Sequence, residues 1–172
     1  MKRDTSLVGI VLLLGCSVSL FAQASKHGSA TSPLDKSRLE QVMAAWATLN
    51  ASRAAPFYAT DDPGLVIYDI APLKYSGWAE VEKGAVEAFQ PIKSMTLKLN
   101  DDAEIHNTGN LAWATATLVM DLLTKDGSRK KIDARWTTIW EKRGASWIIV
   151  HEHLSTPPPP VSAPEPTLPK SP

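Results

Sequence analysis

The last regular stretch of the chain places a glutamate between two histidines, in the order His151, Glu152 and His153. These residue types occur in metal sites and in acid–base sites. Side chains alternate between the two faces of a strand, so His151 and His153 would share one face and Glu152 would lie on the other. A metal site needs three or four ligands that converge from one side. We therefore expect no metal, and a structural role in hydrogen bonds for the two histidines.

A second acidic residue, Asp69, ends a short apolar run and is followed by the apolar residues 70–72. Partial burial would raise the pKa of this carboxyl and suit it to accept a proton or to anchor a ligand donor. Asp69 and Glu152 are therefore the candidate catalytic pair. The alternative is that Asp69 only caps the loop that leads to Trp78.

The charge state of Glu152 depends on how the last two strands pair. If Trp140 lies opposite Trp147, Arg135 faces Glu152 and the two form a structural ion pair. If the turn between the strands adds one residue, Glu152 faces Trp136, and poor solvation raises its pKa. A slip of one residue moves every side chain to the other face, and the sequence leaves both registers open.

The elements that would position these residues change type along the chain. Apolar residues recur at helical spacing from Leu34 to Leu49 and again from Trp78 to Phe89. After Pro91 the pattern alternates as in strands, with turn residues between the runs. This order predicts an α+β fold, with N-terminal helices packed on a curved antiparallel sheet.

The ending RWTTIWEKRGASWIIVHEHLS resembles the SnoaL-like branch of the nuclear transport factor 2-like superfamily. Its most specific part is W-x6-W followed by V-H-x-H-x-S, and the resemblance covers about Leu34 to Pro157. It implies the cone-shaped fold of ketosteroid isomerases, in which helices and sheet enclose a pocket, and a dimer formed through the sheet. Members include isomerases, cyclases, dehydratases, binding modules and oligomerisation domains, so the fold alone selects no function.

The resemblance can be tested one residue at a time. Ketosteroid isomerases use an aspartate base with a tyrosine and a protonated aspartic acid. Asp69 matches the position of the base. The position of the tyrosine falls near Ala45 or Trp46, and that of the second acid near Thr137 or Thr138. One of three parts is present, so we do not expect isomerisation of the steroid type.

The ending is also similar to the association domain of calcium/calmodulin-dependent kinases, but Thr115, Thr138 and Leu154 stand at the positions of its three pocket arginines. In the family the position of Leu154 faces the pocket, which implies that Glu152 does too. Together with six tryptophans, this suits a small apolar or aromatic ligand. The candidate ligand-binding residues are Tyr68, Trp78, Trp113, Trp136, Thr138, Trp140 and Leu154.

Three hypotheses of function follow. The first is an exported protein that binds a small, largely apolar molecule. The second is a cofactor-independent isomerase, lyase or hydrolase that uses Asp69 and Glu152 as acid and base. The third is a non-catalytic dimerisation module. We expect a homodimer on the sheet face that carries His151 and His153, together with Trp147 and Ile149.

Composition and motifs narrow these hypotheses. Eighteen basic residues balance 18 acidic ones, which leaves no electrostatic footprint for nucleic acid. No phosphate-binding loop or dinucleotide fingerprint occurs in the sequence, so we expect no cofactor. The expected folded domain spans residues 32–156, with a linker at 25–31 and a disordered proline-rich tail at 157–172.

The first 24 residues have the form of an export signal: a positive start, an apolar run from Leu7 to Phe21, and Ala22-Gln23-Ala24 as a small-x-small cleavage pattern. We predict cleavage after Ala24 and a periplasmic or secreted protein. N-terminal sequencing of the mature protein should therefore read from Ser25. A lipidated Cys16 at the new N-terminus would instead support the alternative of a lipoprotein.

Overall fold

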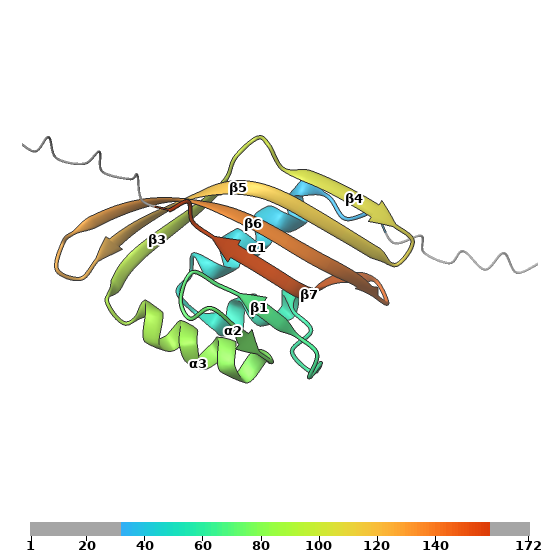
Figure 1. The fold of residues 1–172 in the computed structure, drawn as a ribbon, viewed down its shortest axis with the longest axis horizontal. Helices are drawn as coiled ribbons and strands as arrows, with labels where there is room; N and C mark the ends of the chain where they lie inside the picture. The colour runs from blue at the N-terminus through green and yellow to red at the C-terminus, as the bar shows by residue number, and fades with distance from the viewer. Residues whose placement is uncertain (1–31, 159–172) are drawn as a thin grey trace, which may run out of the picture. The chain divides into compact units, whose positions relative to one another are not determined.

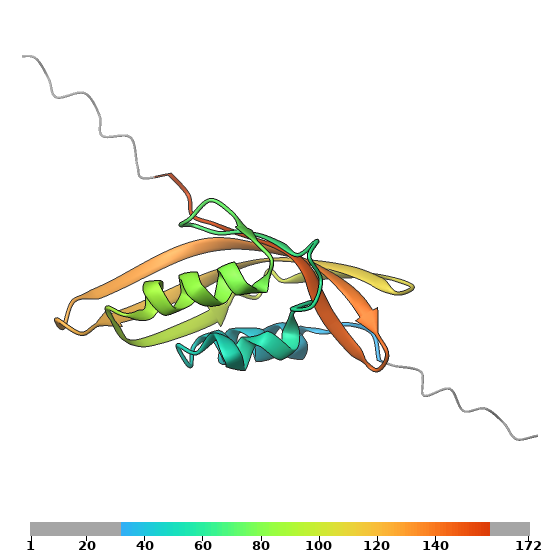
Figure 2. The same ribbon diagram turned by 90° about the horizontal axis from the view of Figure 1, so that it is seen from below.

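A computed structural model describes residues 32–158; the predicted signal peptide, the linker and tail residues 159–172 lie outside these residues. The described part has the expected α+β architecture, with one seven-stranded curved sheet and helices along one of its faces (Figures 1 and 2). The helical segments are α1 (Lys36–Trp46), α2 (Ala51–Ala54), the 3₁₀ helix η1 (Ala55–Phe57) and α3 (Trp78–Phe89).

The first helix begins directly after its N-cap residue, Asp35. The carboxylate of Asp35 accepts a hydrogen bond from the backbone N–H of Arg38, which satisfies one of the free donors at the start of α1. Leu39, Val42 and Met43 then recur on the buried face. Between residues 32 and 158, no helix is long and apolar enough to span a membrane.

The strands follow the order β2-β1-β7-β6-β5-β3 across the sheet, and β4 also pairs with β5. Their bounds are β1 (Val66–Tyr68), β2 (Tyr75–Ser76), β3 (Ile92–Leu99), β4 (Glu104–Thr108), β5 (Leu111–Thr124), β6 (Arg129–Arg143) and β7 (Ser146–Ser155). The sheet is mixed rather than antiparallel throughout, because β1 lies parallel to β7. Parallel neighbours need a long connection, and here the connection contains α3 and most of the sheet. The pairing sets Ile67 beside Glu152.

The pairing of β6 with β7 differs from both registers considered above. Arg135 lies opposite Ser155, and Glu152 lies opposite Thr138. The turn between the strands lies further along the chain than the register with Trp140 opposite Trp147 assumed: Arg143 pairs directly with Ser146 across two central residues, the first of them a glycine with φ of 61°. Such a left-handed conformation favours glycine.

A β-bulge at Val150 then shifts the register again, since Trp140 pairs with Ile149 but Ile139 pairs with His151. The bulge reverses the alternation along β7. Trp147 and Ile149 are buried on the helix side, and beyond the bulge Glu152 is buried on that side.

This corrects the expected composition of the outer sheet face. Trp147 and Ile149 do not lie there, and its exposed apolar side chains are instead Leu111, Trp113 and Ile139. That a second copy pairs with this face stays a prediction.

The core fills the space between the helices and the inner sheet face. Trp136 and Trp140 are its largest fully buried side chains, and Leu39, Leu118 and Ile149 are fully buried in the same cluster. The indole N–H of Trp140 donates to the Thr138 hydroxyl at 2.7 Å, which satisfies a polar group that would otherwise be buried alone.

Gly84 allows α3 to pack closely against Tyr75. A Cβ atom at this position would overlap the phenol oxygen and ring of Tyr75. Tyr75 is only 7% exposed. Glycine to alanine inside a helix normally stabilises it by about 1 kcal/mol. Here we predict that Gly84→Ala destabilises the domain by about 1–3 kcal/mol through overpacking, as measured by urea unfolding.

The control is the same substitution in a Tyr75→Ala background. Because the overlapping ring is then gone, alanine at position 84 should stabilise the helix as it does elsewhere. A stabilising effect of Gly84→Ala in the unaltered chain would contradict the proposed contact.

Candidate functional site

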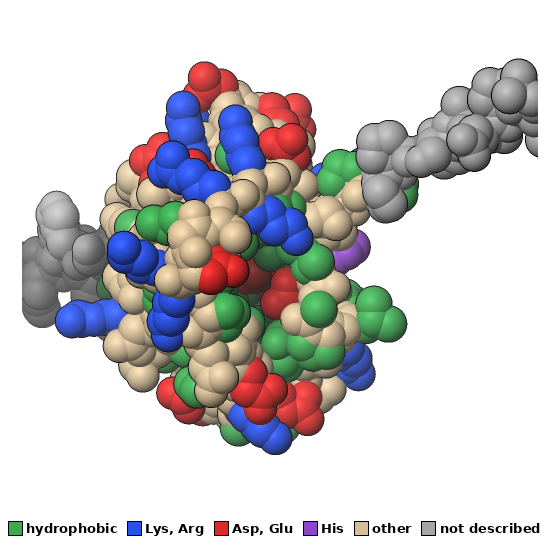
Figure 3. Space-filling view, turned by 90° about the vertical axis from the view of Figure 1, so that its left-hand side faces the viewer, with side chains coloured by type: hydrophobic (Ala, Val, Ile, Leu, Met, Phe, Trp, Pro, Cys, Tyr) green, Lys and Arg blue, Asp and Glu red, His purple; other side chains and the backbone are tan. Residues whose placement is uncertain are grey.

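A cavity of about 490 Å³ lies between the helices and the inner face of the sheet. Its walls are mostly apolar, and two carboxyl groups, those of Asp69 and Glu152, also line it. Figure 3 shows a hollow in the surface, with acidic side chains inside it and apolar side chains around it. The lining residues include Met43 and Trp46 from α1, Val81, Ala85, Ala88 and Phe89 from α3, and Met95, Leu97, Leu118, Met120, Trp136 and Leu154 from the sheet.

Glu152 is held by a short chain of hydrogen bonds. The phenol of Tyr58 donates to Oε2 of Glu152 at 2.5 Å, and the indole N–H of Trp46 donates to the Tyr58 oxygen at 2.8 Å. Tyr58 is 3% exposed and Glu152 is 8% exposed. The three residues come from α1, the residue after η1 and β7, so the chain of bonds joins the helical layer to the last strand.

The pKa of Glu152 is raised to about 7: burial is the largest cause and the nearby negative charge of Asp69 adds to it, while the Tyr58 hydrogen bond and the nearby Trp136 oppose the rise. The buried indole nitrogen of Trp136 has no acceptor at hydrogen-bonding distance and angle. Burial also raises the pKa of Tyr58 well above its ordinary value, and the Glu152 charge adds to this effect. Near neutral pH, Tyr58 is therefore a neutral donor, and Glu152 exchanges between its charged and neutral forms.

Asp69 follows β1 directly, and the parallel pairing of β1 with β7 brings it to the same end of the sheet as Glu152. Burial raises its pKa, and a hydrogen bond from the backbone N–H of Ile70 at 2.6 Å opposes this shift. The Asp69 charge in turn contributes to the raised pKa of Tyr75. The two carboxyl groups therefore act on the same small volume.

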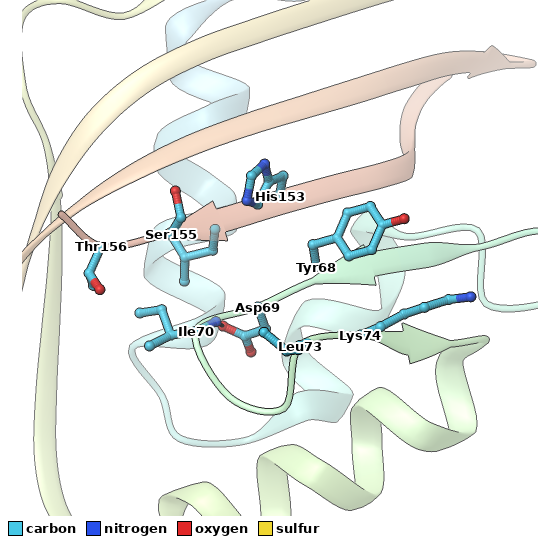
Figure 4. A pocket seen from close by; sticks show the side chains of 9 residues that line it. Tyr68, Asp69, Ile70, Leu73, Lys74, His153, Ser155 and Thr156 are labelled. Atoms are coloured by element: carbon cyan, nitrogen blue, oxygen red, sulfur yellow. Dashed lines mark hydrogen bonds between the residues drawn. The ribbon is translucent and has the colours of Figure 1, made fainter. Parts of the chain in front are cut away.

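Asp69 also borders a second, more open groove of about 560 Å³ on the outer side of the loop after β1. Figure 4 shows this groove between the loop and the end of β7. It is lined by Tyr68, Asp69, Ile70, Leu73, Lys74, His153, Leu154, Ser155 and Thr156. Asp69 and its neighbour Ile70 thus form a thin wall between the outer groove and the inner cavity.

The structure separates the candidate ligand-binding residues into three groups. Trp136 and Leu154 line the inner cavity with Asp69 and Glu152. Thr138 and Trp140 are fully buried beside it, in contact with each other.

The remaining candidates lie elsewhere. The Trp78 ring packs on the rings of Trp46 and Tyr58 behind the cavity wall. Trp113 is 44% exposed and stacks on His106, on the outer sheet face. Tyr68 is 43% exposed and borders only the outer groove.

The three candidate structural residues all lie away from the cavity. Arg135 is exposed and forms no ion pair within the described part of the chain. His151 and His153 pack edge-on against the Tyr68 ring. In residues 32–158, no three side chains of histidine, cysteine, aspartate or glutamate gather as metal ligands would.

Two polar groups, one beside the cavity and one lining it, lay outside the candidate site residues chosen from the sequence. Tyr58 contacts Glu152 across 94 positions of sequence, and no local pattern signals such a long-range pair. Lys130 lines the cavity from β6, where its side chain is exposed. Lys130 lies an even number of positions before Trp136 on β6, so the two side chains share a face of the strand. Because Trp136 faces inward, Lys130 does too.

The chain resembles known proteins in both sequence and fold. A family model described as a SnoaL-like domain matches residues 36–159. Among curated proteins, none matches the chain.

Solved structures share the fold at low sequence identity. A nuclear transport factor 2-like superfamily protein from Salmonella enterica is 20% identical, with a TM-score of 0.65 over 72% of this chain and 89% of that one. A nuclear transport factor 2-like protein from Pseudomonas putida is 22% identical, with a TM-score of 0.58 over 70% and 82%.

A third structure, from Novosphingobium aromaticivorans and provisionally named a scytalone dehydratase, is 9% identical, with a TM-score of 0.62 over 70% of this chain and 80% of that one. At such identities these likenesses concern the fold. The family match covers the helices, the sheet and the cavity together. The chain therefore belongs to the SnoaL-like domain family.

Proposed function

We propose that this protein binds a small, largely apolar molecule in the cavity between α1, α3 and the sheet. The observation that carries the proposal is the cavity itself, about 490 Å³ of space with predominantly apolar walls and two carboxyl groups. Sites for small molecules have volumes of roughly 300–1,000 Å³ and this same pairing of apolar walls with few polar groups. A pure dimerisation module would need no such cavity. The proposal includes export of the protein to the periplasm or the medium.

A second candidate function is proton transfer on the bound molecule. Two carboxyl groups in unlike environments are the usual basis of acid–base assignments. Glu152 is the more buried, and with a pKa of about 7 it can supply a proton near neutral pH. Asp69, which is more exposed than Glu152, would be the base. This would be an isomerase, lyase or hydrolase reaction without a cofactor, and the dehydratase name of one fold relative is compatible with it.

Filling the cavity tests the binding proposal directly. Ala88 and Val86 both lie exposed on α3, but Ala88 lines the cavity and Val86 does not. N-phenyl-1-naphthylamine, a neutral dye that fluoresces in apolar surroundings, should bind the unaltered protein. We predict that Ala88→Trp weakens this binding by about tenfold or more, since the indole occupies the ligand's space. Val86→Trp is the matched control and should leave the dye titration unchanged.

Equal dye binding by both variants would show that the dye sits elsewhere and would contradict the proposal. Mass spectrometry of the protein under native conditions would then reveal whether a co-purified molecule occupies the cavity and excludes the dye.

The buried carboxyl predicts how stability varies with pH. The folded-state pKa of Glu152, about 7, lies above its unfolded value of 4.5. Folding therefore favours the neutral form, and a free-energy cost develops as the pH rises from 4.5 and is complete above 7. Glu152→Gln removes this cost while its amide oxygen can still accept from Tyr58. We expect the variant to be more stable than the unaltered chain at pH 8, by up to about 3 kcal/mol, and about equally stable near pH 4.5.

Urea unfolding at the two pH values measures this difference. Glu82→Gln, at an exposed position of α3, is the control and should change stability little at either pH. A stability difference between Glu152→Gln and the unaltered chain that is the same at both pH values would show that Glu152 is not held in an unfavourable charged state.

A further inference from the structure

We propose that the molecule bound in the cavity carries a cationic nitrogen, an ammonium group on an apolar body, and that Asp69 and Glu152 hold this group. The inference rests on the proposed binding function and goes beyond it by naming the ligand's chemical class. It follows from the charges in the cavity, from the hydrogen bonds that the two carboxyl groups leave unmade, and from the aromatic walls.

The two carboxyl groups have no cation as partner. None of the ion pairs between described residues includes Asp69 or Glu152. A carboxylate removed from water without a compensating charge is costly, and for this reason buried acids are usually paired. A ligand cation would provide the missing charge to both groups at once.

The carboxyl groups also have acceptor oxygens to spare. Glu152 receives the Tyr58 hydroxyl on Oε2, and Asp69 receives the Ile70 N–H on Oδ1. The indole N–H of Trp136 lies near Glu152 but outside hydrogen-bonding geometry, and no hydrogen bond from another described residue reaches the second oxygen of either group. An ammonium has three N–H donors and no acceptor, which matches a site made of acceptors.

Aromatic rings complete the surroundings. Trp46, Tyr75, Phe89 and Trp136 all line the cavity. The faces of aromatic rings attract cations, most strongly where water is excluded. A ligand carboxylate would instead meet two acids of like charge, and a neutral ligand would leave them uncompensated.

The other ionisable groups that line the cavity or lie beside it do not reverse this balance. Tyr58 and Tyr75 have raised pKa values and stay neutral near pH 7. Lys130 is the one cation among the lining residues, and its exposed side chain pairs with neither carboxyl. If Lys130 governed the site, the preferred ligand would be an anion, and the experiment below separates these cases.

The test uses three probes that share one indole ring and differ in their end group: tryptamine (ammonium), tryptophol (hydroxyl) and indole-3-acetate (carboxylate). Calorimetric titration at pH 8 should show tryptamine binding at least about tenfold more tightly than tryptophol, and indole-3-acetate binding most weakly. At pH 5 Glu152 is mostly neutral, whereas an alkyl ammonium stays charged to about pH 10. The advantage of tryptamine over tryptophol should therefore shrink at pH 5.

Variants assign the effect to the cavity. Asp69→Asn and Glu152→Gln should each reduce the advantage of tryptamine at pH 8 while tryptophol still binds, which shows that the variant is folded. Asp133→Asn removes the same charge from an exposed position of β6 and should preserve the advantage. Lys130→Gln should leave it equal or larger.

Equal affinities for tryptamine and tryptophol would overturn the cationic ligand and leave the apolar pocket standing. Tightest binding of indole-3-acetate, lost in Lys130→Gln, would also overturn it in favour of an anion. Failure of all three probes to bind would count against the proposed function as well.

Discussion

The hydrogen bond from Tyr58 to Glu152 organises the interior of this domain. It joins a residue of the helical layer to the last strand, and both partners are buried. A carboxyl group in such surroundings is costly to ionise. The charged and neutral forms of Glu152 are therefore about equally populated near neutral pH. The tryptophan behind Tyr58, Trp46, orients the phenol by donating to its oxygen, which leaves the phenol hydrogen free for Glu152. The oriented carboxyl group of Glu152 is thus a polar part of the cavity lining, which is otherwise mostly apolar.

The fold could be predicted from the sequence because it depends on repeated local patterns. The change from helical to alternating spacing after Pro91 separates the helices from the sheet, and the ending with its paired tryptophans resembles the family that the chain belongs to. The parallel pairing of β1 with β7 could not be predicted from such local patterns. The three residues of β1 carry no periodicity that would reveal their direction, and their parallel partner, β7, comes at the other end of the domain's sequence.

The site was predictable only in part, for a related reason. Asp69 could be chosen because it lies among apolar residues and matches the position of the family's base, and Glu152 because strand alternation places it on the same face as Leu154. Which tryptophans reach the cavity depends on strand register, and one extra residue at Val150 reverses the alternation along β7. Trp113 is a separate case: it lies on the outer face of β5, whose alternate residues from Ala112 to Met120 are buried. Long-range partners such as Tyr58 arise only once the layers have packed.

The parallel pairing of β1 with β7 also bears on how the domain folds. The contact between Ile67 and Glu152 closes a loop that encloses nearly the whole sheet, and contacts of such sequence separation form late and slowly. Until β7 has joined β6, the short β1–β2 ribbon has only its own two residue pairs to hold it, and Asp69 has no fixed place. The cavity would thus be the last part of the molecule to acquire its shape. Chains that stop short of β7 would expose the edge of β6 to other chains, which is a common route to aggregation.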